Sequence, residues 1–184
     1  MFALTPRLTL RPGWPEDAPE LARAIGHEAV VTKLARAPWP YGEEDARSFL
    51  SQPRGADEPN FLVFDRTGGQ PRLVGGVGVD IQADDGPELG YWFTPDAWGR
   101  GYATEAGRAV VEIARDALRL PRLSARHMVG NDASARVLAK LGFRATGRTV
   151  GLPCRALGRE VEAVETVLGL DDAECEPGTM PLAA

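Results

Sequence analysis

The sequence predicts an α/β domain in which helices cover both faces of a mixed β-sheet. Two observations lead to this fold class. Short runs of strand-forming residues alternate along the chain with segments whose apolar residues recur at helical spacing. The 184 residues also contain neither an internal repeat nor a linker between two apolar regions. We therefore expect a single domain over residues 1–170, followed by a flexible tail over residues 171–184.

The N-terminal third predicts one strand followed by helices. Apolar and polar residues alternate over residues 6–12, which is typical of a half-buried strand. Three helical patterns come next, and they begin at Pro15, near residue 28 and at Glu43. A proline-rich segment over residues 38–42 separates the last two, because proline cannot continue a helix.

A hairpin and a further strand are predicted in the middle of the chain. Strand-like runs occur at three places, over residues 61–64, 73–81 and 88–93. Gly75, Gly76 and Gly78 weaken the second of these runs, because glycine has no side chain to pack. We expect a helix or a ligand to lie close against them.

The most informative stretch is the loop after the last of these strands. It reads Trp98-Gly99-Arg100-Gly101-Tyr102-Ala103, and a helical pattern follows it directly. Glycines let the backbone approach a ligand closely, and the first N–H groups of a helix have no partner within the helix. The sequence therefore predicts a site for a phosphate or pyrophosphate. Within the helix, Gly107 costs about 1 kcal/mol relative to alanine, and we expect close helix–sheet packing as its reason.

The C-terminal third predicts a strand, a helix and a final pair of strands. The strand covers residues 123–128, and Asn131 or Asp132 caps the helix that follows. Residues 143–150 and 161–168 predict the strand pair, joined by a loop that contains glycine and proline.

The glycine loop matches neither of the two commonest phosphate-binding motifs. No Gly-Lys-Ser/Thr follows its glycines, and Thr104 occupies the third glycine position of the dinucleotide fingerprint. Its spacing resembles motif A of the GNAT superfamily of acyl-CoA-dependent N-acyltransferases. Gly101 and Ala103 stand at matching positions, whereas Trp98 replaces the usual first polar residue.

Two further segments resemble one branch of that superfamily, the ribosomal-protein N-terminal acetyltransferases (RimJ/RimL-like). They are Asn131-x-x-Ser134 and Lys140-Leu-Gly-Phe143, which follow the loop in the order and spacing of that branch. The resemblance implies a three-layer α/β/α domain with a mixed, largely antiparallel sheet of six or seven strands. It also implies that the strands at 88–93 and 123–128 splay apart, so that the pantetheine of acetyl-CoA inserts between them.

The loop and the resemblance together assign the residues that would bind acetyl-CoA. The expected ligands of the pyrophosphate are Gly99, Arg100, Gly101, Tyr102 and Ala103. The resemblance implies that backbone N–H groups of the central strand polarise the thioester carbonyl, around Tyr91, Trp92 and Phe93. Asn131 either contacts the pantetheine or only caps its helix.

Acetyl transfer to an amine also requires a base and a hydroxyl near the sulfur. Glu88 is the candidate base, directly or through water, because it begins the strand that lines the acceptor side. The alternative bases are Glu160, Glu162 and Glu165. Ser134 is the candidate hydroxyl that protonates the leaving thiolate, and the alternative is a purely structural hydrogen bond to nearby backbone.

The predicted function is acetyl-CoA-dependent N-acetylation of a primary amine by direct attack in a ternary complex. The acceptor is either a protein N-terminus or a small-molecule amine, and the sequence leaves this choice open. Trp39 and Tyr41 are expected to line the acceptor pocket, unless they only pack the proline-rich segment. The alternative function is a non-catalytic acyl-CoA-binding sensor, which keeps the loop but has lost the acid and base.

Composition and charge narrow the setting of this activity. The net charge is −5 and the isoelectric point is about 5.1, so we expect no nucleic-acid partner. The two cysteines, Cys154 and Cys175, have no metal-ligand spacing, so we expect no metal. No stretch approaches the roughly 20 apolar residues of a membrane span, so we expect a cytoplasmic location without a membrane partner. The family resemblance allows a homodimer.

Overall fold

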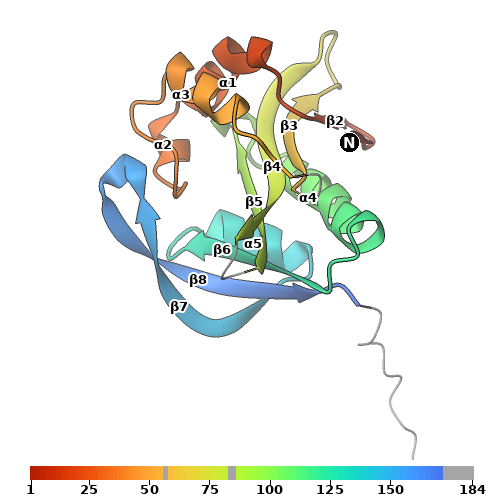
Figure 1. The fold of residues 1–184 in the computed structure, drawn as a ribbon, viewed down its shortest axis with the longest axis vertical. Coiled ribbons are helices and arrows are strands. Elements are labelled where there is room, and N and C mark those ends of the chain that lie inside the picture. Colours follow the sequence, from red (N-terminus) through yellow and green to blue (C-terminus); the bar gives the residue numbers. More distant parts are fainter. Residues whose placement is uncertain (56–57, 83–85, 172–184) are drawn as a thin grey trace, which may run out of the picture.

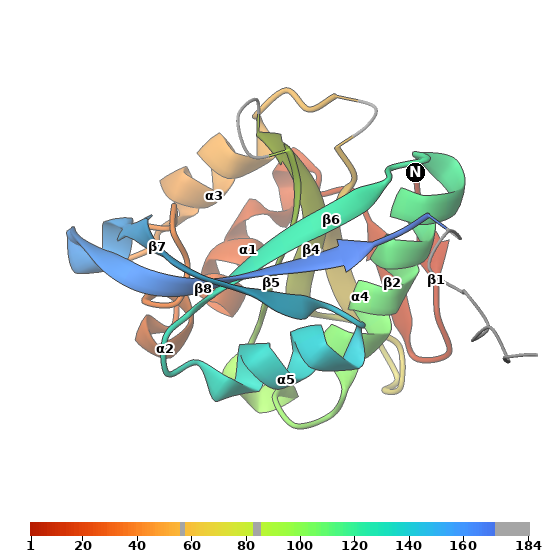
Figure 2. The same cartoon turned by 90° about the horizontal axis from the view of Figure 1, so that it is seen from below.

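A computed structural model describes residues 1–55, 58–82 and 86–171. Apart from its first residue, the tail expected over residues 171–184 lies outside this described part. The described chain forms an eight-stranded sheet in the order β1-β2-β3-β4-β5-β6-β8-β7, with helices on both faces (Figures 1 and 2). The predicted fold class is confirmed, but the sheet is larger than the six or seven strands expected. The sequence pattern missed β1 (Ala3–Leu4), a two-residue edge strand.

The first five strands are antiparallel to one another in sequence order, from β1 to β5, and they form one half of the sheet. The bounds are β2 (Leu8–Arg11), β3 (Asn60–Asp65), β4 (Arg72–Gln82) and β5 (Gly86–Phe93). The glycines of β4 make room for neighbouring strands. A Cβ atom on Gly75 would lie 2.6 Å from the ring of Phe93, and one on Gly76 would lie 2.6 Å from the indole nitrogen of Trp92. The expectation of a helix or ligand at these glycines is therefore wrong.

Two groups of helices bury the two faces of the sheet. One face is covered by α1 (Ala18–Ile25), α2 (Glu28–Val31) and α3 (Glu43–Leu50), and the other by α4 (Tyr102–Glu112) and α5 (Asp132–Lys140). A Cβ atom on Gly107 of α4 would lie 2.7 Å from Leu141, at the end of α5. This glycine therefore permits helix–helix contact, and the helix–sheet packing expected from the sequence is wrong.

The sheet opens between β5 and β6 (Arg122–Met128). These strands are parallel, and they pair at one position, Glu88 with Ser124. Beyond it the two strands diverge, as Figures 1 and 2 show. The expected splay is confirmed, and it leaves the C-terminal half of β5 without a strand partner on that side.

The last two strands, β7 (Arg144–Cys154) and β8 (Arg159–Gly169), form a long hairpin. Gly151 and Pro153 belong to β7 itself and not to the connecting loop, which differs from the expectation. A proline is tolerated there because β7 is an edge strand. The hairpin tip contacts the segment after α2, where the Arg155 N–H donates to the Ala35 carbonyl at 2.9 Å.

Candidate functional site

The glycine loop and the first turn of α4 present a row of backbone donors. Gly99 and Gly101 have φ angles of 75° and 80°, in the left-handed region that favours glycine. Gly101 is the N-terminal cap residue of α4 and has no capping side chain. Within the described residues, the N–H groups of Gly99, Arg100 and Gly101 make no hydrogen bond. Together with the free N–H groups of the first helical turn, they form an arrangement that suits an anion.

Arg7, just before β2, stabilises this loop through hydrogen bonds. Its guanidinium donates to the Arg100 carbonyl at 2.9 Å and to the Glu105 carboxylate at 2.7 Å. Burial alone would raise the pKa of Glu105, but hydrogen bonds from Thr5 and Arg7 hold that pKa below its ordinary value. Arg7 was not predicted as a site residue, because it lies 98 positions from Glu105 and no local pattern links them.

The side chain of Tyr102 is structural. It is only 3% exposed, and its hydroxyl donates to the carboxylate of Asp65 at 2.9 Å. Burial would raise the pKa of Asp65, but hydrogen bonds from Thr67 and Tyr102 and the charge of Arg100 lower it. Of the predicted pyrophosphate ligands, Tyr102 therefore offers its backbone N–H, as does Ala103, which packs against the core. The guanidinium of Arg100 is half-exposed and lies 3.9 Å from Asp65.

The central strand directs backbone donors toward the splay. The Thr94 N–H donates to the Val74 carbonyl of β4 at 2.9 Å. Alternate N–H groups along a strand point the same way, so those of Tyr91 and Phe93 point away from β4, toward the side where β6 has diverged. The N–H of Trp92 points toward β4, and the rings of Trp92 and Phe93 pack in the core.

Ser134 lies across the splay from β5, in the first turn of α5. The side chain of Asn131 accepts a hydrogen bond from the Ser134 N–H at 3.3 Å, so Asn131 caps the helix. The Ser134 hydroxyl lies 2.7 Å from the Tyr91 hydroxyl, which is also 3.2 Å from the Ser134 carbonyl. Burial raises the pKa of Tyr91 to about 12, although its hydrogen bond with Ser134 lowers that pKa somewhat. Only the backbone of Tyr91 was predicted to take part in the site, and its hydroxyl was not.

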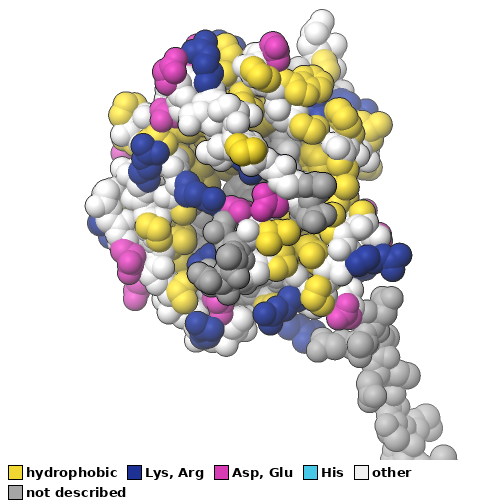
Figure 3. All heavy atoms as spheres, viewed as in Figure 1, with side chains coloured by type: hydrophobic (Ala, Val, Ile, Leu, Met, Phe, Trp, Pro, Cys, Tyr) yellow, Lys and Arg dark blue, Asp and Glu magenta, His cyan; other side chains and the backbone are white. Residues whose placement is uncertain are grey.

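Glu88 lies on the opposite face of the sheet from Tyr91. Both of its carboxylate oxygens accept hydrogen bonds from Arg126 of β6, at 3.0 and 2.5 Å. Asp80 of β4 is directly opposite Glu88 in the sheet and pairs with Arg36, whose side chain is 77% exposed. Two like charges facing each other would repel, and the two arginines offset this repulsion. Figure 3 shows acidic and basic side chains close to one another near the middle of its view.

The other acceptor-side candidates lie on the connection between α2 and α3 and on β8. Trp39 and Tyr41 are on the connection between α2 and α3, the segment that also carries Arg36. Trp39 is 43% exposed, whereas Tyr41 packs against the core formed with α1–α3. Burial, together with the charge of Asp45, raises the pKa of Tyr41 to about 12. The three alternative bases lie on β8, where Glu160 and Glu162 are exposed and Glu165 accepts a hydrogen bond from Thr146 at 2.9 Å.

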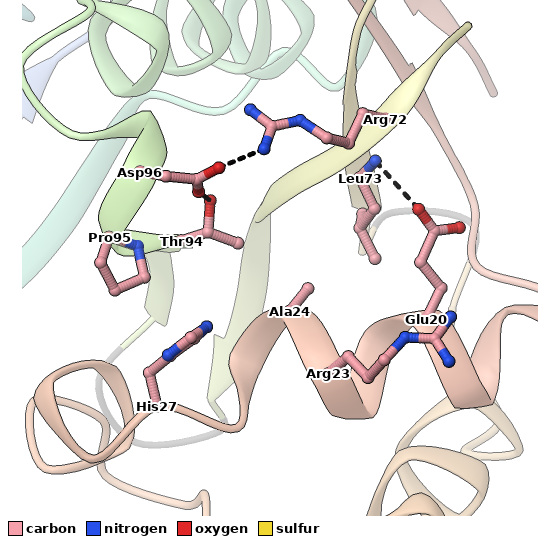
Figure 4. Close-up of a pocket in the computed structure, with 9 residues that line it drawn as sticks. All are labelled: Glu20, Arg23, Ala24, His27, Arg72, Leu73, Thr94, Pro95 and Asp96. Atoms are coloured by element: carbon pink, nitrogen blue, oxygen red, sulfur yellow. Dashed lines mark hydrogen bonds and ion pairs between the residues drawn. The ribbon is translucent and has the colours of Figure 1, made fainter.

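One cavity lies apart from these residues. It has a volume of about 420 Å³ and lies between α1 and the ends of β4 and β5 (Figure 4). Arg72 pairs with Asp96 on one side, and Glu20 accepts a hydrogen bond from the Leu73 N–H on the other. None of the site residues predicted from the sequence lines this cavity, so we place the candidate site at the splay and the glycine loop.

Within the described residues, no three His, Cys, Asp or Glu side chains gather closely enough to hold a metal ion. No described helix combines the length and apolar character that a bilayer crossing requires.

Known proteins are similar to this chain in sequence and in fold. Among curated proteins, the uncharacterized N-acetyltransferase YnaD of Bacillus subtilis (strain 168) is 32% identical over 108 residues, which cover 58% of this chain and 62% of that protein. The match thus spans less than two thirds of that relative.

Solved structures share the whole fold. A GNAT-family acetyltransferase from Bacillus anthracis has a TM-score of 0.77 at 25% identity, with 92% of this chain and 98% of that chain covered. The ribosomal-protein-S5-alanine acetyltransferase from Vibrio fischeri has a TM-score of 0.77 at 20% identity, with 94% and 98% covered. The sequence profile of the acetyltransferase (GNAT) domain matches residues 7–144, and this chain therefore belongs to the GNAT acetyltransferase family.

Proposed function

We propose that this protein transfers an acetyl group from acetyl-CoA to a primary amine by direct attack within a ternary complex. The observation that carries the proposal is the row of unpartnered N–H groups at the glycine loop, beside the splay of β5 and β6. Backbone donors at a helix N-terminus favour a pyrophosphate. A gap between two strands can take an extended chain such as pantetheine. A cytoplasmic location and a homodimer stay predictions.

The donor would be held mainly by backbone groups. Gly99, Arg100 and Gly101 would donate to the pyrophosphate, and the Arg100 side chain would exchange its long contact with Asp65 for a phosphate oxygen. The N–H groups of Tyr91 and Phe93 would stabilise the oxyanion that forms at the thioester carbon.

The acceptor amine would be deprotonated from the opposite face. An α-amino group has a pKa of about 8 and a lysine one of about 10.4, so the amine must lose a proton. Glu88 is the proposed base. Because Arg126 occupies both of its oxygens, Glu88 would act through a water molecule or after one of these contacts loosens. Trp39 would provide an exposed aromatic wall beside this position, with Tyr41 supporting it from the core.

Direct attack is supported by the state of Cys154. Its thiol is buried and lies 3.4 Å from the Leu34 carbonyl and 3.6 Å from that of Thr32. It therefore offers no exposed nucleophile for an acetyl-enzyme intermediate.

The proposal is tested by measuring CoA release from acetyl-CoA with a panel of amines. The panel contains peptides that begin with alanine or serine, spermidine and an aminoglycoside. We expect saturable acetyl-CoA binding and turnover with at least one class of amine. Tight binding without turnover by any member would favour the non-catalytic acyl-CoA sensor, and absence of binding would remove the proposed donor.

A further inference from the structure

The contact between Tyr91 and Ser134 is built from both sides of the splay. Tyr91 lies on β5 and Ser134 on α5, 43 positions later in the sequence, and their hydroxyl oxygens are 2.7 Å apart. The phenol is mostly buried, and Asn131 fixes the first turn of α5 through the Ser134 N–H. The position of the Ser134 hydroxyl is therefore set by Tyr91 and Asn131, and not by its own rotamer preference alone.

The protons of this pair can be arranged in two ways. If Ser134 donates to Tyr91, then the tyrosine proton goes to the Ser134 carbonyl at 3.2 Å, and no proton is left to face a ligand. If Tyr91 donates to Ser134, then the serine proton is free to point into the splay. Each hydroxyl has one proton and accepts through its lone pairs. A negative charge in the splay selects the second arrangement, because it attracts the free proton.

The pKa of Tyr91 decides whether the pair protonates a thiolate or only donates a hydrogen bond to it. The pKa of Tyr91 is raised to about 12 by burial, whereas a thiol has a pKa of about 8.5. Transfer of the tyrosine proton to a thiolate is therefore unfavourable by three to four orders of magnitude. The pair keeps its protons and offers a hydrogen bond, which stabilises the thiolate without consuming an acid.

We infer that Tyr91 is a positioning residue for Ser134, and that the pair donates one hydrogen bond to the leaving CoA thiolate. This inference rests on the proposed function. In the reaction, the C–N bond forms and the C–S bond breaks, and the electron pair of that bond stays on sulfur. Tyr91 donates to the Ser134 Oγ, and the Ser134 hydroxyl donates to the sulfur. The proton that finally reaches the sulfur comes from solvent, and the proton lost by the amine leaves through the base.

The direct test is a titration of the thiol of bound CoA, followed by the ultraviolet absorbance of the thiolate. A hydrogen bond to a charged group changes an equilibrium by about 10- to 100-fold. We expect CoA bound to the wild-type protein to be more acidic than free CoA by that factor. Tyr91→Phe and Ser134→Ala should each remove most of this gain, while CoA still binds. The control Thr166→Val removes another buried hydroxyl, one that donates to the Ala125 carbonyl at 2.8 Å. In this control, bound CoA should stay as acidic as in the wild type.

A double-mutant cycle completes the test with acetyl-CoA and the best amine of the panel. Tyr91→Phe should lower kcat about 10-fold or more, with little change in the KM for acetyl-CoA. It should have no further effect when Ser134 is already alanine, because its action passes through that hydroxyl. The inference is overturned if CoA binds with the acidity of free CoA, or if the two substitutions lower kcat independently. Failure of wild-type CoA binding would instead refute the proposed function.

Discussion

The two faces of β5 hold different kinds of chemistry. On the α4 and α5 face, Tyr91 meets Ser134 in a contact between two neutral hydroxyls. On the opposite face, Glu88 is held by Arg126, and its neighbour Asp80 is held by Arg36. Tyr91 and Glu88 lie on opposite faces, because they are three residues apart on a strand with regular register to β4.

This difference indicates a division of tasks between the faces. The face with Tyr91 offers protonated hydroxyls, and the N–H groups at the open edge of β5 lie beside them. Both can stabilise negative charge on a thioester oxygen or sulfur without changing their own protonation. The face with Glu88 offers a carboxylate, which can take a proton from an amine but must first loosen its contacts with Arg126. Substitutions on the two faces should therefore change different kinetic parameters.

The largest effect is expected from Glu88→Gln. Loss of a general base lowers turnover by about 10²- to 10⁴-fold, and acetyl-CoA affinity should stay unchanged because the donor lies on the other face. Steady-state kinetics and calorimetry measure the two quantities. The matched control is Asp80→Asn, since Asp80 is the register partner of Glu88 and is also paired with an arginine. If both variants keep wild-type turnover, Glu88 is not the base.

The next effect concerns the donor face, through Arg7→Met. This change removes the hydrogen bonds from Arg7 to the Arg100 carbonyl and to Glu105. We expect acetyl-CoA affinity to fall about 10-fold, because hydrogen bonds to charged groups are worth roughly 1.5–3 kcal/mol and the loop loses its support. Turnover at saturation should change little.

Arg11→Met is the matched control for this change. Arg11 is the last residue of β2, the strand that begins directly after Arg7, and it forms a bidentate pair with Asp17, away from the loop. Equal losses of acetyl-CoA affinity in the two variants would mean that general stability, and not loop support, explains the result.

A smaller effect is expected from Trp39→Ala. Removal of an exposed aromatic wall should raise the KM for the amine a few-fold, since the side chain is only partly desolvated. The KM for acetyl-CoA should not change. A change in the donor KM alone would place Trp39 outside the acceptor pocket.

The smallest effect is a pH dependence of stability. The folded-state pKa of Glu105 is lowered, so its contribution to stability is present above its unfolded pKa of about 4.5 and is lost as the pH falls through the folded value. Below pH 4.5 the melting temperature of the wild type should therefore fall more steeply than that of Glu105→Gln. The corresponding difference in the free energy of unfolding is about 1 kcal/mol or less. Parallel curves for the two proteins would contradict the contribution of Glu105.

The sequence predicted the parts of the site that depend on short segments. Gly99 and Gly101 could be identified because left-handed backbone and free N–H groups at a helix start have a local signature. The fold class followed from the order of strands and helices. Asn131 or Asp132 was expected to cap α5 for the same local reason, and Asn131 is the cap.

The sequence did not predict contacts that depend on how distant segments meet. The pairing of Glu88 with Arg126 spans 38 positions, and that of Arg7 with Glu105 spans 98. Both depend on strand register and on where helices cross the sheet, which single-residue preferences do not encode. The reason expected for Gly107 was wrong on the same ground, because its neighbour Leu141 is the C-terminal cap residue of another helix, α5.

The central claim is that backbone N–H groups of the glycine loop bind the pyrophosphate of acetyl-CoA. Calorimetric titration with acetyl-CoA tests it on the wild type, Gly101→Val and Gly147→Val. The two glycines have φ angles of 80° and 83°, so both substitutions strain the backbone similarly. We predict saturable binding to the wild type and to Gly147→Val, and loss of binding in Gly101→Val, whose side chain would block the donors. No saturation of the wild type at millimolar acetyl-CoA, or full affinity in Gly101→Val, would contradict the claim.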